Sequence, residues 1–180
     1  MEFIKTKIPD VIVIRPKIFR DSRGHFSQTY HKELFFKNGV AVEFVQDNQS
    51  FSKKGVVRAL HYQLAPKAQA KLVRVVRGEV FDVAVDIRKG SRTFGQYVSE
   101  ILSAENKKML YVPAGFAHGF CALQDNTELL YKMSDFYSPE LERGIVWNDP
   151  DIAIQWPKLD TEHILCDRDK NFPTLKQAVV

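Results

Sequence analysis

The sequence is poor in cysteine. Its two cysteines, Cys121 and Cys166, lie far apart in the chain. Small secreted proteins carry an even set of closely spaced cysteines, and structural zinc sites carry paired ones. The chain matches neither pattern, so we expect no disulfide framework and no zinc site.

Long apolar runs are also missing. No stretch of about 18 apolar residues is present, which excludes a membrane-spanning helix. The N-terminal segment MEFIKTKIPDVIVIRP is interrupted by proline and is too short for the apolar part of a signal peptide followed by a cleavage site. We therefore expect no membrane association and a cytoplasmic location.

The basic residues form no long run, although the net charge is +4. The chain shows no RRM, KH or zinc-finger pattern, so nucleic acid is not expected as a partner. The charge leaves small anionic ligands open, and it is also compatible with no anionic partner. A length of 180 residues fits one domain, residues 1–180, with a single core.

Segments typical of β-strands dominate the chain. They recur at roughly the 8–12-residue spacing of sandwiches and barrels. The run KLVRVVRGEVFDVAVDIR, residues 71–88, predicts a hairpin that turns at Arg77-Gly78-Glu79. Helical patterns are few: HKELFFKNG, residues 31–39, predicts one short helix that ends at Gly39, and the tail predicts a helical turn. The expected fold class is an all-β sandwich or jelly roll.

The segment FDVAVDIR has a clear period of two. Val83, Val85 and Ile87 fall on one face of the strand, and Asp82 and Asp86 on the other. The first face belongs to a core. Two carboxylates on the second face favour a solvated surface over a polar cavity.

The segment VVRALHYQ combines a strand pattern with Arg58 and His61, and Lys71 follows with no acidic residue between them. Arginine and lysine bind phosphate, and histidine exchanges a proton near neutral pH. These groups suit proton abstraction next to a carbonyl on a phosphorylated substrate. Because Arg58 and His61 are three residues apart, a regular strand would point them to opposite faces. A shared cavity then requires a bulge, a twist, or a site wide enough to be reached from the edge of the strand.

Two fragments match loose cupin motifs. Gly55 precedes His61 by the cupin spacing, and Pro113, Gly115 and His118 form the second motif. Gln63 stands where a metal-binding histidine belongs, and no glutamate follows it. Such a set is a poor metal site, so the chain resembles a cupin that has lost its metal, and we expect neither metal nor cofactor.

Six blocks together resemble the dTDP-4-dehydrorhamnose 3,5-epimerase family over nearly the whole chain. They are FRDSRGHFSQTY, FVQDNQSFSKKGVVRALHYQ, AKLVRVVRGEVFDVAVDIRKGSRTFGQY, LSAENKKMLYVPAGFAHGFCAL, YKMSDFYSPELERGIVWNDPDIAIQWP and LCDRDKNFP. The resemblance implies a homodimeric, metal-free, cupin-like jelly roll. It also implies epimerisation at C3 and C5 of a dTDP-linked 4-keto-6-deoxy sugar, on the way to dTDP-L-rhamnose and cell-surface polysaccharide.

The resemblance also implies the catalytic groups. His61 is the implied base, and Asp169 is preferred over Asp167 as the carboxylate that orients it. Tyr131 is the implied acid. Lys71 would stabilise the enolate at O4, with His118 near the sugar.

The nucleotide side is implied in the same way. Within segment 23–28, which in the family reaches the partner subunit's site, the resemblance assigns substrate contacts to three residues. Arg58 would hold the diphosphate and Tyr137 would stack on thymine. The full set implied for substrate binding is Arg23, Phe26, Gln28, Gln46, Asn48, Arg58, Lys71, His118, Tyr137, Glu142 and Arg168.

The sequence departs from the family pattern at two notable positions. Gln28 replaces a glutamate, and Ala59 replaces a glycine, which requires an ordinary backbone conformation there. Two alternatives stay open: an epimerase that acts at C3 or C5 only on a related nucleotide sugar, and a non-catalytic sugar-nucleotide-binding cupin. The complete set His61, Lys71, Tyr131 and Asp169 argues against the second. A metal-dependent cupin is disfavoured by Gln63.

Overall fold

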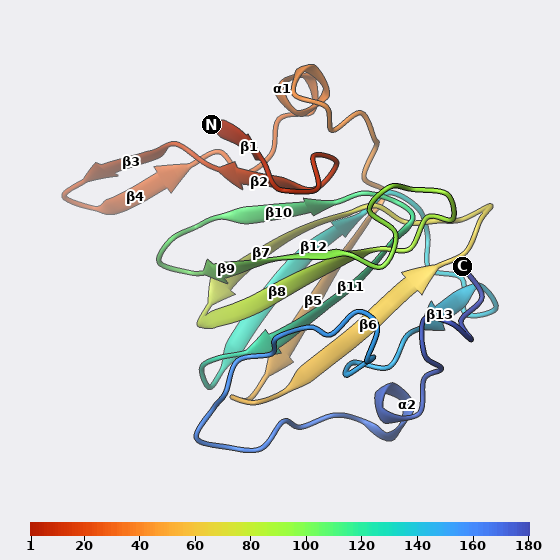
Figure 1. The fold of residues 1–180 in the computed structure, drawn as a ribbon. Helices are drawn as coiled ribbons and strands as arrows, with labels where there is room; N and C mark the ends of the chain where they lie inside the picture. The colour runs from red at the N-terminus through yellow and green to blue at the C-terminus, as the bar shows by residue number, and fades with distance from the viewer.

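A computed structural model describes residues 1–180, and nearly all of its regular structure is antiparallel β-sheet (Figure 1). The larger sheet has the order β1 (Glu2–Lys5), β2 (Ile12–Arg15), β10 (Met109–Val112), β7 (Lys71–Arg77), β12 (Thr127–Met133) and β5 (Gln46–Ser52). The smaller sheet has the order β13 (Glu142–Gly144), β6 (Val57–Gln63), β11 (Phe116–Ala122), β8 (Glu79–Asp86) and β9 (Tyr97–Ser103). A separate hairpin pairs β3 (Ile18–Asp21) with β4 (Gly24–Ser27), and the helices are α1 (Lys32–Lys37) and α2 (Asp167–Lys170). The all-β prediction is confirmed.

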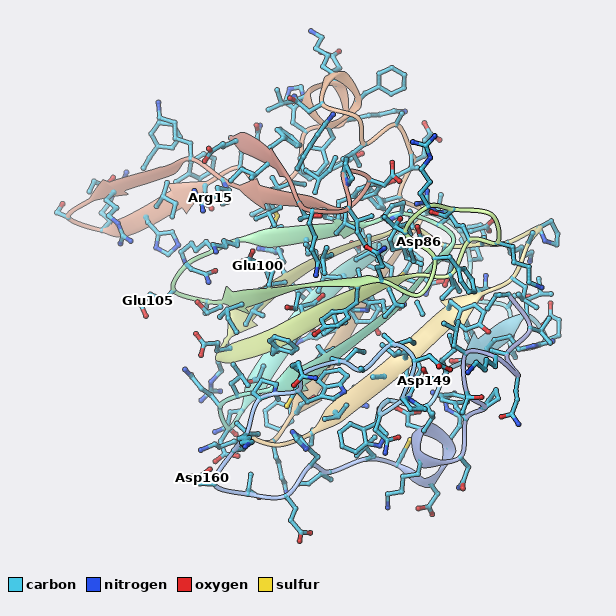
Figure 2. The ribbon with its side chains drawn as sticks, viewed as in Figure 1. Arg15, Asp86, Glu100, Glu105, Asp149 and Asp160 are labelled. Atoms are coloured by element: carbon cyan, nitrogen blue, oxygen red, sulfur yellow. The ribbon has the colours of Figure 1, made fainter.

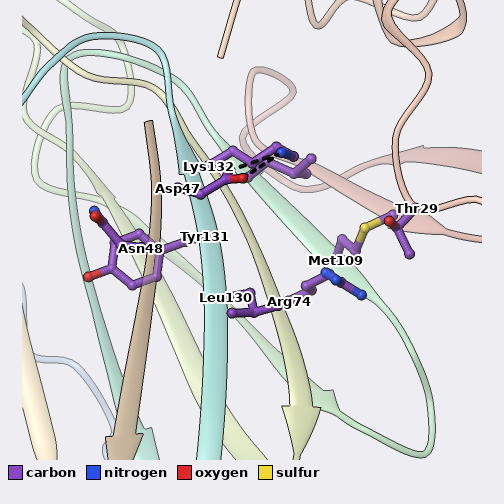
Figure 3. Close-up of a pocket in the computed structure, with 9 residues that line it drawn as sticks. Thr29, Asp47, Asn48, Arg74, Met109, Leu130, Tyr131 and Lys132 are labelled. Atoms are coloured by element: carbon purple, nitrogen blue, oxygen red, sulfur yellow. Dashed lines mark hydrogen bonds and ion pairs between the residues drawn. The ribbon is translucent and has the colours of Figure 1, made fainter. Parts of the chain in front are cut away.

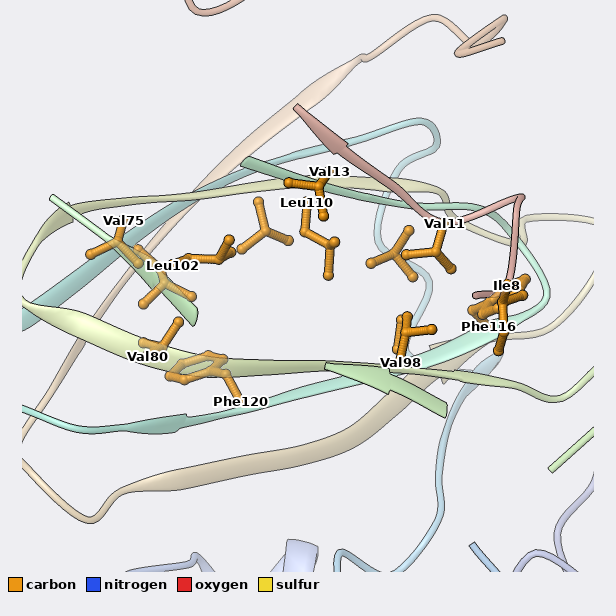
Figure 4. Close-up of a cluster of buried hydrophobic side chains, with 14 residues drawn as sticks. Ile8, Val11, Val13, Val75, Val80, Val98, Leu102, Leu110, Phe116 and Phe120 are labelled. Atoms are coloured by element: carbon orange, nitrogen blue, oxygen red, sulfur yellow. The ribbon is translucent and has the colours of Figure 1, made fainter. Parts of the chain in front are cut away.

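The two sheets enclose the main core, which is drawn in Figure 4. Alternate side chains of the facing strands point inward, and each buried aliphatic or aromatic side chain contributes about 1.5–3 kcal/mol relative to exposure. The core consists of Ile8, Val11, Val13, Val73, Val75, Val80, Ala84, Val98, Leu102, Leu110, Val112, Phe116, Phe120 and Leu129.

The predicted hairpin over residues 71–88 is wrong. β7 pairs with β10 and β12 in the larger sheet, whereas β8 pairs with β11 and β9 in the smaller one. Only Gly78 separates β7 from β8, and a hairpin loop needs at least two residues. Gly78 has a φ of 75°, and a Cβ on it would collide with Thr127. The chain therefore crosses from one sheet to the other at this residue.

The alternation over residues 82–87 is confirmed. The expectation that the face with Asp82 and Asp86 is solvated is wrong. Val83 and Val85 pack outside the smaller sheet, whereas Asp82 and Asp86 point inward and are fully buried. Asp86, labelled in Figure 2, accepts hydrogen bonds from Arg88 at 2.7 Å and from a serine and a threonine hydroxyl at 2.6 Å each. The preference for a solvated surface was wrong because a period of two identifies a shared face but not what covers it.

Two further segments cover the outer faces of the sandwich. The predicted helix at residues 31–39 is confirmed as α1, whose Phe35 packs on the outer face of the larger sheet. The C-terminal tail covers the smaller sheet, and Asp149 anchors it (Figure 2) by accepting the Leu175 N–H at 2.7 Å. This tail carries α2, the predicted helical turn, to the edge of β6. Neither helix has the length and apolar character needed to cross a membrane.

Candidate active site

Strand β6 contains a bulge, one of the alternatives that the spacing of Arg58 and His61 left open. His118 on β11 is opposite His61, yet Phe120, two residues later, is opposite Arg58, three residues earlier. One extra residue in β6 accounts for this shift. Ala59 has no positive φ, as expected, and its side chain occupies space that Gly119 leaves free, because a Cβ on Gly119 would collide with it. The Ala59–Leu60 peptide bond is cis.

His61 is paired with a carboxylate from the C-terminal tail. Its Nε2 atom lies 3.0 Å from Oδ1 of Asp169, which is 2% exposed. Oδ2 of Asp169 also accepts the Ala59 N–H at 3.3 Å. Burial raises the pKa of Asp169, but the hydrogen bond and charge of His61 and the Ala59 N–H outweigh it and keep that pKa below its usual value. The side chain of Asp167, by contrast, is 96% exposed.

Lys71 extends from the larger sheet towards His61. Its Nζ atom lies 3.4 Å from the carbonyl oxygen of His61. Burial lowers the pKa of Lys71 to about 8, and the charges of Asp82 and Glu142 act in the opposite direction. Lys71 is therefore a buried ammonium group that remains mostly protonated at neutral pH.

His118 lies beside His61 on the neighbouring strand. Its Nε2 atom is 2.9 Å from Oδ1 of the fully buried Asp82, whose other oxygen has no hydrogen-bond partner. Burial lowers the pKa of His118, although the Asp82 charge opposes this shift. A neutral His118 uses one nitrogen on Asp82 and keeps the other available for a ligand.

A cavity of about 140 Å³ opens between the ends of the two sheets. His61 faces it from the smaller sheet, whereas Lys71 and Tyr131 face it from the larger sheet. Burial raises the pKa of Tyr131, an effect that Arg58 and Asn48 partly offset, so its phenol stays protonated at neutral pH. The lining residues are Asn48, His61, Tyr62, Gln63, Gln69, Lys71, Tyr131, Met133, Tyr137 and Glu142.

Figure 3 shows a second pocket, on the other side of β12. The Tyr131 ring lies beside Asn48 and points away from Arg74 and Met109. Lys132 and Asp47 are ion-paired at 3.0 Å in this pocket, and it contains no histidine. We therefore assign the acid–base chemistry to the cavity that contains His61.

Polar contacts link the residues at the rim of the cavity. The Tyr137 hydroxyl donates to Oε2 of Glu142 at 2.8 Å, and Arg168 contacts the same oxygen at 2.9 Å. The Tyr137 N–H donates to Oε1 of Gln46 at 3.0 Å, and the amide of Gln46 donates to Asn48 at 3.0 Å. Four residues expected to bind nucleotide therefore form one connected group with Tyr137.

Other expected residues lie outside the cavity of the single chain. Arg58 is exposed and donates to Ser52 and to the Phe51 carbonyl. In segment 23–28, the Arg23 side chain is 88% exposed and ion-paired with Asp21, and Phe26 and Gln28 are also exposed. This segment projects from the body with the β3–β4 hairpin (Figure 1).

Several lining residues were not expected from the sequence: Tyr62, Gln63, Gln69 and Met133. Gln63 is two residues after His61, so the strand period could have indicated it. Asp82 was also missed as a site residue, although its place on the inner face of β8 follows from the same period. Gln69 lies in a loop, and no periodic pattern predicts its position.

The chain matches known proteins along nearly its full length. The family model described as dTDP-4-dehydrorhamnose 3,5-epimerase matches residues 5–177. A dTDP-4-dehydrorhamnose 3,5-epimerase from Shigella flexneri is 56% identical, with 95% of this chain and 94% of that protein covered. One from Pseudomonas aeruginosa is 53% identical over 99% and 98%.

A solved structure has the same fold. The dTDP-6-deoxy-D-glucose-3,5-epimerase from Legionella pneumophila, in complex with dTDP-4-keto-L-rhamnose, superposes with a TM-score of 0.94 and 46% identity. The match covers 98% of this chain and 93% of the Legionella chain. The expected cupin-like architecture is therefore confirmed.

Proposed function

The chain belongs to the dTDP-4-dehydrorhamnose 3,5-epimerase family, and on that premise we propose which of its residues carry each step. The protein is an epimerase that acts at C3 and C5 of the dTDP-linked 4-keto-6-deoxy sugar, in the pathway to dTDP-L-rhamnose. Each inversion needs a base on one face of the sugar, an acid on the other and stabilisation of the enolate at O4.

We propose that His61 is the base. A carboxylate can only accept a hydrogen bond, so the contact with Asp169 assigns the proton to Nε2 and leaves the lone pair on Nδ1. Nδ1 then removes the proton next to the 4-keto group, and Asp169 stabilises the imidazolium that forms. A positioned base of this kind contributes about 10²–10⁴ in rate.

Lys71 supplies the positive charge that stabilises the enolate oxygen. Its buried ammonium group lies 3.4 Å from the His61 carbonyl oxygen, beside the proposed base, and we infer that O4 of the sugar binds next to it. A donor aimed at a developing oxyanion lowers the barrier by about 2.7–4 kcal/mol. His118, neutral because it is buried, adds a second polar contact near the sugar.

Tyr131 is the proposed acid. One observation carries this proposal: His61 and Tyr131 line one cavity from two different sheets. A planar enolate held between them loses its proton to one residue and gains a proton from the other on the opposite face, which inverts the carbon. Burial keeps the Tyr131 phenol protonated for that delivery.

The nucleotide extends along the rim. Tyr137 provides a flat, half-exposed ring for thymine, and Arg168 and Glu142 hold that side of the rim. Arg58 is an exposed guanidinium suited to the diphosphate. Gln46 and Asn48 offer amide groups beside them.

We also propose that the protein is a homodimer in the cytoplasm. The hairpin β3–β4 exposes Phe19 by 52% and Phe26 by 69%, an apolar pair that a second copy would cover. In that arrangement Arg23, Phe26 and Gln28 complete the partner's site. Free thiols at Cys121 and Cys166 fit a reducing compartment.

The proposal is tested by incubating the protein with dTDP-4-keto-6-deoxyglucose in D₂O and following the sugar by NMR. We expect deuterium at both C3 and C5 with the wild type. With His61→Asn we expect no exchange at either carbon. Label at one carbon would indicate an epimerase of C3 or C5 only. Persistent exchange in His61→Asn would contradict the assignment of the base.

A further inference from the structure

Gln63 is a buried polar residue that none of the proposed catalytic steps uses. It lies two residues after His61 on β6 and is 6% exposed. Its amide nitrogen donates to the carbonyl oxygens of Lys67 at 2.5 Å and Phe136 at 3.1 Å. Its amide oxygen accepts the N–H of Ser138 at 2.9 Å.

These bonds hold the backbone on both sides of Tyr137. Phe136 and Ser138 are its neighbours, and all three lie in the irregular segment between the end of β12 and the start of β13. Gln63 ties that segment to β6, which lies between β13 and β11 in the smaller sheet. The opposite residue on β13 is Glu142, which holds the Tyr137 hydroxyl. Tyr137 is therefore fixed at its backbone by Gln63 and at its hydroxyl by Glu142.

Glutamine is the side chain that this position requires. Two backbone carbonyls need donors and one backbone N–H needs an acceptor, and a primary amide offers both. Methionine has a similar length but leaves all three groups unpaired. Glutamate could accept from Ser138, but its carboxylate would face the oxygens of Lys67 and Phe136. Ser138 is 2% exposed, so with methionine its N–H would be left buried without a partner, and that favours displacement of the segment.

We propose that Gln63 is a positioning residue for nucleobase recognition, acting through Tyr137. This rests on the proposed role of Tyr137 as the surface on which thymine stacks. Gln63 lines the cavity, but its hydrogen bonds go to the backbone of Lys67, Phe136 and Ser138 and to no proposed catalytic group. Its loss should therefore raise KM for the nucleotide sugar and leave kcat largely intact. Ligands that contain a nucleobase should therefore lose affinity when Gln63 is replaced, and ligands without a nucleobase should not.

Calorimetry with dTDP, which has a nucleobase, and with inorganic pyrophosphate, which has none, tests whether only nucleobase binding depends on Gln63. Tyr137→Ala should weaken dTDP by about 5- to 140-fold, the range for loss of one base–aromatic stack, and leave pyrophosphate unchanged. Gln63→Met and Gln63→Glu should weaken dTDP several-fold with pyrophosphate unchanged. Gln49→Met, on the exposed face of β5, is the matched control and should bind both ligands like the wild type.

The double variant decides whether Gln63 acts through Tyr137. In the Tyr137→Ala background, Gln63→Met should cause no further loss of dTDP affinity. A full additional loss would overturn the proposal. Weakened pyrophosphate binding in Gln63→Met would also overturn it, because that result means general damage to the site.

Amide hydrogen exchange tests whether Gln63 holds this segment, independently of any ligand, because the Ser138 N–H donates directly to Gln63. In Gln63→Met, exchange at residues 136–138 should accelerate at least tenfold, whereas exchange in the core strand β8 should not change. Unchanged exchange at 136–138 would overturn the proposal. Faster exchange with wild-type dTDP affinity in both Gln63→Met and Tyr137→Ala would instead remove Tyr137 from base recognition, and with it the role proposed for Gln63.

Discussion

His61 and Asp169 are more than 100 positions apart in sequence, yet the histidine Nε2 lies 3.0 Å from the carboxylate. The tail that Asp149 anchors brings α2 against β6, and only this docking puts a buried carboxylate behind the histidine. Phe172, one turn further, packs edge-on against the His61 ring. The tail therefore fixes both the tautomer and the orientation of the proposed base.

Replacing Asp169 with asparagine should disable the base without removing it. The amide can donate to Nε2, which would move the imidazole proton to Nδ1 and block proton abstraction. We expect kcat to fall by about 10²–10⁴-fold. The matched control is Asp167→Asn, because that carboxylate is exposed and should be dispensable. Equal activity of the two variants would contradict the pairing. Steady-state turnover of the dTDP-sugar measures both.

Lys71 should lower the stability of the folded state while serving the reaction. Its pKa is about 8 in the folded protein and 10.5 in an unfolded chain, so the folded state disfavours the charged form. The cost is complete below pH 8, on the order of 3 kcal/mol, and disappears as pH rises towards 10.5. Lys71→Met should therefore be more stable than wild type at pH 7, with a difference that shrinks between pH 8 and 10.5.

Denaturant unfolding across this pH range measures that difference. Lys53→Met, at an exposed site, is the control and should show no such trend. Lys71→Met should also lose epimerisation by about two orders of magnitude, since no cation remains for the enolate. A Lys71→Met protein that is less stable at pH 7 and equally stable at pH 10 would reverse the predicted sign.

The exposed hairpin should link assembly to nucleotide binding. Phe26→Ser removes a large apolar contact from segment 23–28, and we expect a shift towards monomer with a loss of dTDP affinity of about tenfold or more. Phe36→Ser on α1 is a control of similar exposure and should remain dimeric. Light scattering and calorimetry give the two readouts. A verified monomer with wild-type affinity would show that the site is complete within one chain.

Sequence patterns predicted the fold class and the short helix at residues 31–39 because both depend on local periodicity and turn residues. They failed where the outcome depends on which sheet a strand joins and on what covers each of its faces. Val83 and Asp82 alternate as predicted, yet nothing local tells that the larger sheet covers the aspartate. The hairpin at residues 71–88 failed because the single residue Gly78 allows a crossing between sheets but is too short for a reversal.

The site divides in a similar way. His61, Lys71 and Tyr131 were expected and line one cavity. A bulge was one of the ways to bring Arg58 and His61 to one site, and β6 has one, but its position depends on pairing with β11 and Arg58 lies outside the cavity of the single chain. The strand period places Gln63 on the same face as His61, but its bond to the Ser138 N–H, like the bond of Gln69 to the Asp135 carbonyl, joins residues far apart in sequence and is not recorded by any motif.

The central claim is that a base and an acid face the sugar from two sheets, and Tyr131→Phe tests it most directly. In D₂O, NMR should show deuterium entering the substrate at a rate within about tenfold of wild type, while inversion falls by about 10²–10⁴-fold. Tyr30→Phe, outside the cavity, should behave like the wild type. Full epimerisation by Tyr131→Phe would contradict the account.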